Sequence, residues 1–140
     1  MKTSELMIGD WVNYRPGWVK EETGEVEYES ESMFPIKLTC IFEDLVQYDD
    51  EFTDGIINTI EVADYEIFPI PLTAEILEKN GFVYNDLPFL QNWQQFGLSL
   101  YQGGNGYRIN CGENVSMKIS SVHELQHAIR LCGIDKTIEL

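Results

Sequence analysis

The sequence is short of cationic residues and has no long apolar run, and each shortage excludes a class of protein. Nine Lys and Arg residues stand against 24 Asp and Glu residues among 140, which gives a net charge of -15. Such a surface repels phosphate backbones, so we expect no direct nucleic-acid binding. No segment approaches the roughly 18 uninterrupted apolar residues of a membrane helix, and the N-terminus lacks the apolar run of a signal peptide. We therefore expect a cytoplasmic protein that does not bind membranes.

Cysteine is also scarce. The three cysteines, Cys40, Cys111 and Cys132, are odd in number, far apart and not arranged as Cys-x-x-Cys. This pattern does not indicate a disulfide framework or a zinc ribbon, and it is typical of small, buried apolar residues. With 44% hydrophobic and 12% aromatic residues, the chain has the composition of an ordered globular protein.

The acidic residues are unevenly placed. Residues 1 to 66 hold 17 Asp and Glu residues against 4 Lys and Arg residues, whereas residues 67 to 140 hold 7 against 5. The acidity therefore belongs to the N-terminal half, where it favours basic partners, metal ions or simple solubility. A solvated acidic face is the ordinary explanation of such a charge run. A second explanation is a decoy that occupies a DNA-binding protein by imitating phosphate charge.

The N-terminal half has the pattern of a small β structure. Short alternating or β-branched runs recur at Trp11 to Tyr14, Gly24 to Tyr28, Ile36 to Phe42 and Ile56 to Val62. They predict an SH3-like barrel or a strongly curved sheet over residues 1–70. The run 38–46 also fits a helical stripe, and we choose strand for Thr39 to Phe42 because of its β-branched and aromatic content.

Two acidic segments, 21–32 and 47–55, are expected to be loops between these strands. Asp50 to Gly55 followed by Glu61 matches an EF-hand loop at four positions. However, Phe52 occupies a position where calcium requires an oxygen ligand. The segment therefore predicts an acidic hairpin turn.

A proline-containing joint separates the two halves. Pro69 and Pro71 hold the chain extended, and Thr73 can then cap a helix that Gly81 ends. We expect lobes at 1–70 and 71–140, or one compact domain that contains both.

The C-terminal half predicts an antiparallel meander covered by a helix. Phe96 to Tyr101, Tyr107 to Cys111 and Val115 to Ile119 each alternate with one apolar face, and the Gly103 to Gly106 connection is a hairpin turn. A helix follows from Ser121, with Leu125 and Ile129 toward the sheet and with His123, Gln126, His127 and Arg130 on the opposite face. The fold class is therefore α+β.

The same helix contains His-Glu-x-x-His, a spacing that zinc hydrolases use. His123 and His127 could both reach one zinc ion, and Glu124 could act as a general base. A third protein ligand is missing from the pattern, however, and Ser121 and Glu124 have the spacing of a capping box. We therefore assign no catalytic residue and no cofactor, and we keep zinc at His123 and His127 as an alternative.

Three stretches resemble a family of small uncharacterised bacterial proteins that are often encoded near mobile elements. They are Leu6 to Val12, Pro69 to Phe82 and Val122 to Gln126, and the region from the first stretch to the last covers most of the chain. The resemblance implies no activity and no functional residues. It supports an architectural role for the helix that contains Leu125.

These observations favour a non-enzymatic binding or interaction module, with a protein partner preferred over a small ligand. Trp11, Tyr14 and Trp18 are the candidate surface, because SH3-like barrels often bind through aromatic grooves. The zinc hydrolase and the acidic decoy are the two alternatives.

Overall fold

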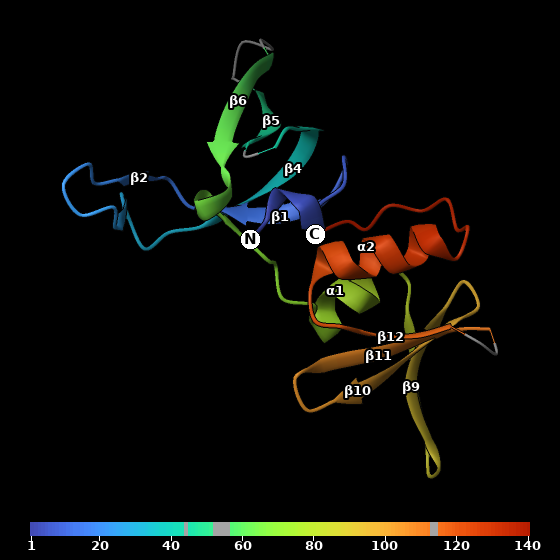
Figure 1. The fold of residues 1–140 in the computed structure, drawn as a ribbon. Helices are drawn as coiled ribbons and strands as arrows, with labels where there is room; N and C mark the ends of the chain where they lie inside the picture. Colours follow the sequence, from blue (N-terminus) through green and yellow to red (C-terminus); the bar gives the residue numbers. More distant parts are fainter. Residues whose placement is uncertain (44, 52–56, 113–114) are drawn as a thin grey trace. The chain divides into compact units, whose positions relative to one another are not determined.

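The computed structural model describes residues 1–43, 45–51, 57–112 and 115–140 (Figure 1). They divide into two compact units, Met1–Ile70 and Pro71–Leu140. Most of the regular structure is β-strand, and two short α-helices both lie in the second unit, so the fold is α+β. None of the helices in these ranges is long and apolar enough to span a membrane.

Unit 1 contains a five-stranded antiparallel sheet and a separate two-stranded hairpin. The sheet has the order β6-β5-β4-β1-β7, and β2 pairs with β3. The elements are η1 (Thr3–Glu5), β1 (Trp11–Tyr14), β2 (Gly17–Val19), β3 (Val26–Tyr28), β4 (Phe34–Ile41), β5 (Leu45–Glu51), β6 (Ile57–Ala63), η2 (Asp64–Glu66) and β7 (Ile67–Phe68).

The sheet of unit 1 is open, so the expected closed barrel is not formed by the described strands. Its edges are β6 and β7. Closure would require the two edge strands to pair with each other, but among the described strands β7 pairs with β1 and β6 pairs with β5. Alternation buries one face of the sheet around Val12, Ile36 and Leu38.

The choice of strand over helix at residues 39–42 is confirmed as far as Ile41, where β4 ends. Phe42 lies beyond the strand and is exposed. The predicted run Gly24 to Tyr28 contains β3, whereas β5 occupies residues 45–51 and so extends into the segment that was expected to be a loop. Residues 52–56 of the EF-hand-like stretch lie outside the described residues.

Unit 2 is a five-stranded antiparallel meander in the order β12-β11-β10-β9-β8. The predicted strands of this half correspond to β10, β11 and β12, whereas β8 and β9 were not predicted. The strands are β8 (Val83–Leu87), β9 (Leu90–Gln95), β10 (Leu98–Gly103), β11 (Gly106–Cys111) and β12 (Val115–Ile119), and the helices are α1 (Ala74–Lys79) and α2 (Val122–Leu131).

The signals that start and end the helices are confirmed. Thr73 Oγ1 accepts a hydrogen bond from Ile76 N at 3.3 Å at the start of α1, and Gly81 follows this helix with φ of 81°. Figure 1 shows α2 on one side of the unit 2 sheet. Leu125 and Ile129 of this helix are fully buried, as the helical pattern predicted.

The inner face of the meander is apolar, with one exception to the prediction. Leu98, Leu100, Ile109 and Ile119 are all buried. Phe96 was expected in a strand on this face, but it lies with Gly97 in the turn between β9 and β10 and is exposed. Both turn residues have positive φ, 53° and 78°, which is typical of a two-residue hairpin turn and delays the start of β10 to Leu98.

Candidate functional site

The two histidines of α2 lie together, but they do not share an exposed outer face. Their ring centroids are 5.7 Å apart in a T-shaped arrangement. The prediction of an exposed face is wrong for His123, which is only 7% exposed, and for Gln126, which is 1% exposed. His123 lies in the first turn, where its Nδ1 is 3.0 Å from Ser121 Oγ, so its ring folds back onto the start of the helix.

Glu124 is occupied by the helix cap. Its Oε2 accepts hydrogen bonds from Ser120 N at 2.6 Å and Ser121 N at 3.0 Å, and from both serine hydroxyls at 3.0 Å. Burial alone would raise the pKa of Glu124, but these hydrogen bonds outweigh it and lower the pKa below its usual value. A carboxylate held in this way faces the backbone at the start of the helix, which leaves it poorly placed to act as a general base.

The His123 and His127 pair has no third protein ligand in the described ranges. No group of three or more His, Cys, Asp or Glu residues could hold a metal ion within residues 1–43, 45–51, 57–112 and 115–140. A catalytic zinc site requires three protein ligands. Zinc at this pair therefore stays a prediction, without support from the described geometry.

The aromatic residues proposed as a binding surface are distributed over different faces. Trp11 and Tyr14 are three positions apart in β1, so they point to opposite faces of the sheet. Tyr14 packs edge to face against Phe34 at 5.0 Å, whereas Trp18 belongs to the separate β2–β3 hairpin and is exposed. One groove on β1 cannot present both Trp11 and Tyr14.

A cluster of exposed apolar residues stands instead at the tip of the β8–β9 hairpin. Leu87 and Leu90 are directly paired, and Pro88 and Phe89 make the two-residue turn between them. Leu87 and Leu90 are exposed, and the side chain of Phe89 is fully exposed. We call Leu87, Phe89 and Leu90 the hairpin tip.

The outer face of the unit 2 sheet, opposite the buried apolar face, is polar. Which side chains lie on this face follows from the alternation along each strand and from the pairing register between strands. The set contains amides, hydroxyls and two cations, and among the described residues it contains no carboxylate. Its polar members are Asn85, Asn92, Gln94, Ser99, Tyr101, Arg108, Asn110, Ser116 and Lys118.

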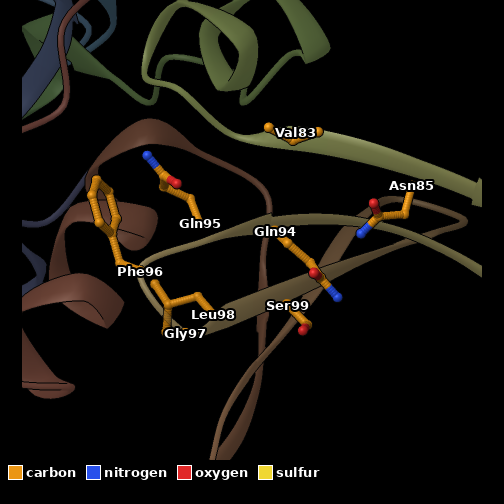
Figure 2. Close-up of a pocket in the computed structure, with 8 residues that line it drawn as sticks. All are labelled: Val83, Asn85, Gln94, Gln95, Phe96, Gly97, Leu98 and Ser99. Atoms are coloured by element: carbon orange, nitrogen blue, oxygen red, sulfur yellow. The ribbon is translucent and has the colours of Figure 1, made fainter.

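A shallow groove of about 630 Å³ lies at the β9–β10 turn, and its lining includes Asn85, Gln94 and Ser99 of this outer face. Figure 2 shows the polar ends of Asn85, Gln94 and Ser99 on the same side of the sheet. Next to them, Asn92 is 1% exposed and accepts a hydrogen bond from Asn85 Nδ2 at 3.2 Å, but its own Nδ2 has no partner among the described residues. A buried amide donor without an acceptor is unusual in a folded protein.

The outer face also carries two cations. Arg108 of β11 is directly opposite Lys118 of β12 in the register, and Tyr101 of β10 is opposite Arg108 on the other side. Both cations line a hollow of about 380 Å³ with the Gly103 to Gly106 turn. The sequence predicted the turn but not the proximity of the cations, which are ten residues apart and become neighbours only through the register.

Comparison of the chain with protein-family models, with curated proteins and with solved structures finds no match in any of the three.

Proposed function

We propose that the protein is a non-enzymatic binding module that contacts a protein partner through the hairpin tip. The observation that carries this proposal is the full exposure of Phe89 between two exposed leucines at the end of a hairpin. Scattered apolar residues are normal on a surface, but a contiguous apolar cluster is typical of interaction sites.

The geometry of the tip suits insertion into an apolar pocket of a partner. The paired β8 and β9 strands hold the backbone on both sides of the turn, so little conformational entropy is lost when the tip binds. Burying a phenylalanine side chain contributes about 2–3 kcal/mol. Aromatic anchors of this kind carry much of the affinity of many interfaces.

The charge of the chain favours a protein over an anionic lipid surface as the partner of the tip. A net charge of -15 repels such a surface, and apolar insertion would have to overcome that repulsion. A protein with an apolar pocket and a neutral or basic rim has no such obstacle.

The test is a capture experiment with matched variants. Wild-type protein, Phe89→Ala and Phe42→Ala are immobilised and exposed to lysate, and bound proteins are identified by mass spectrometry. Phe42 is an exposed phenylalanine of unit 1, so its variant controls for the loss of an exposed ring. We expect a partner that Phe42→Ala retains and that Phe89→Ala binds at least roughly 30-fold more weakly, which corresponds to about 2 kcal/mol.

Equal capture by Phe89→Ala and wild type would refute the role of the hairpin tip. Sedimentation of the purified protein is measured in parallel. A wild-type dimer that Phe89→Ala abolishes would identify the partner as a second copy of the chain.

The acidic decoy is a second candidate because unit 1 carries almost all of the net charge. Residues 1 to 66 hold 17 acidic residues against 4 basic ones. A decoy predicts capture of DNA-binding proteins that high salt releases and that Phe89→Ala retains, because its binding is electrostatic. Apolar insertion at the tip predicts a captured partner that high salt does not release and that Phe89→Ala loses.

We also propose an SH3-like arrangement for unit 1, kinship with the small bacterial proteins near mobile elements, and a cytoplasmic location. The first is supported by the short antiparallel strands of unit 1, and the second by the three stretches that carry the resemblance. None of these proposals assigns an activity. An experimental structure of a protein that contains all three stretches would test the first two together.

A further inference from the structure

Arg108 and Lys118 are like charges at directly opposite positions of the β11–β12 ladder, and both are exposed. Residues directly opposite in an antiparallel ladder have Cβ atoms roughly 5 Å apart, and like charges at such positions destabilise the sheet. The chain has 24 acidic residues, yet no described carboxylate shares this face with the two cations. An anion that binds between the cations would remove the repulsion.

The hollow beside the pair has the features of an oxyanion site. Gly103, Gly104 and Gly106 line it together with Asn105, so three of its four turn positions have no side chain to shield the backbone. A Cβ added at Gly104 would meet no atom within 4 Å, which shows that the turn is open at that point. Exposed backbone at a turn and nearby cations together suit an anion.

The shape of the turn depends on glycine at one position. Gly106 has φ of 133°, a conformation that other residues rarely adopt, and a Cβ there would overlap the carbonyl oxygen of Ile119. Gly106 therefore brings β11 unusually close to the end of β12. Arg108 follows Gly106 by two residues and Lys118 directly precedes Ile119, so both cations are held beside the turn.

We propose that the Gly103 to Gly106 turn, Arg108 and Lys118 bind the phosphate group of a phosphorylated ligand. The guanidinium of Arg108 can donate two parallel hydrogen bonds to phosphate oxygens, and Lys118 supplies a point charge. Tyr101 is directly opposite Arg108 on the same face, where it can contact the rest of the ligand. This site is independent of the hairpin tip.

The test is a titration of ¹⁵N-labelled protein with inorganic phosphate, followed by amide chemical shifts at constant ionic strength, with chloride as the reference anion. We expect saturable shifts at residues 103–108 and 118. Arg108→Gln and Lys118→Gln should each weaken phosphate binding by roughly 10-fold, as the loss of one charge-assisted contact predicts.

The control is the double variant Lys79→Gln and Lys136→Gln, which makes the same change in net charge at exposed positions away from the outer face. It should bind phosphate as wild type does. The Arg108→Gln and Lys118→Gln double variant should be at least as stable as wild type because it removes the repulsion, so its loss of binding cannot come from unfolding. Shifts that do not saturate, that chloride reproduces, or that this double variant retains would each overturn the proposal.

Discussion

Replacing Glu124 by alanine distinguishes a helix cap from a catalytic base. The substitution removes the acceptor for two backbone N–H groups. Ser121 is 3% exposed, so leaving its N–H without an acceptor costs about 1–3 kcal/mol. Ser120 is exposed, and water can replace the carboxylate there at a cost of about 0.5 kcal/mol. The expected loss is about 2 kcal/mol of unfolding free energy, or about 6 °C in Tm.

The assay is urea unfolding followed by circular dichroism, combined with hydrogen exchange to localise the effect. Exchange should increase in the first turn of α2, which begins beside the cap, and in β12, which ends beside it. Glu78→Ala is the control, because Glu78 is an exposed glutamate of α1. This variant should unfold within about 0.5 kcal/mol of wild type.

The stabilisation by Glu124 should depend on pH in a defined direction. Its pKa is lowered in the folded protein, so its contribution is fully present above the unfolded value of about 4.3 and is lost as the pH falls through the folded pKa. Wild type and Glu124→Ala should therefore converge in stability at acidic pH. If Glu124→Ala instead unfolds at the wild-type midpoint and loses bound zinc or a hydrolytic activity, the cap argument is refuted.

Three further perturbations test other parts of the structure. Gly106→Ala should destabilise unit 2 by about 3 kcal/mol or more in urea unfolding, because the new Cβ overlaps the Ile119 carbonyl in a strained backbone conformation. Burial raises the pKa of Tyr14 to about 12, so one tyrosine should stay protonated past pH 11 in an absorbance titration. The pKa of tyrosine in the unfolded chain is about 10. The contribution of Tyr14 to the free energy of unfolding is therefore fully present below pH 10 and is lost as the pH rises through 12. Burial raises the pKa of Cys132 to about 11, so its alkylation by iodoacetamide at pH 8 should be much slower than that of Cys40, as peptide mapping would show.

The parts of the fold with strong periodicity could be predicted from the sequence. The strands β10, β11 and β12 alternate strictly, and the caps at Thr73 and Glu124 have residue types that are favoured at a helix start. The local conformational preference of these segments agrees with the structure, so their secondary structure can be predicted without knowledge of distant contacts.

The strands β5, β8 and β9 could not be predicted because their composition argues against strand. β5 contains Asp49, Asp50 and Glu51, and β8 contains Asn85 and Asp86, which are residue types depleted in sheets. Pairing with β6 and β9 overrides these local preferences. The burial of His123 likewise follows from packing at the start of α2, whereas the helical pattern alone places it with the polar face.

The outer face of unit 2 could not be predicted because it is a product of register. Tyr101, Arg108 and Lys118 come from three strands, and each looks like an ordinary solvent-facing residue in its own run. A shift of one residue in the β11–β12 pairing would separate Arg108 from Lys118, and a shift in the β10–β11 pairing would separate Tyr101 from Arg108. Sequence reasoning identified the Gly103 to Gly106 turn as a hairpin, and only the pairing shows that two cations flank it.

The placement of charge separates the candidate functions more sharply than the total charge does. A decoy that imitates nucleic acid requires a continuous acidic surface, and unit 1 has the composition for one. The outer face of unit 2 has two cations and no described carboxylate, so the same explanation cannot cover it. If the decoy proposal holds, it concerns unit 1 alone. Phosphate binding at Arg108 and Lys118 would then be a separate property of unit 2, because these cations attract phosphate whereas an acidic surface repels it.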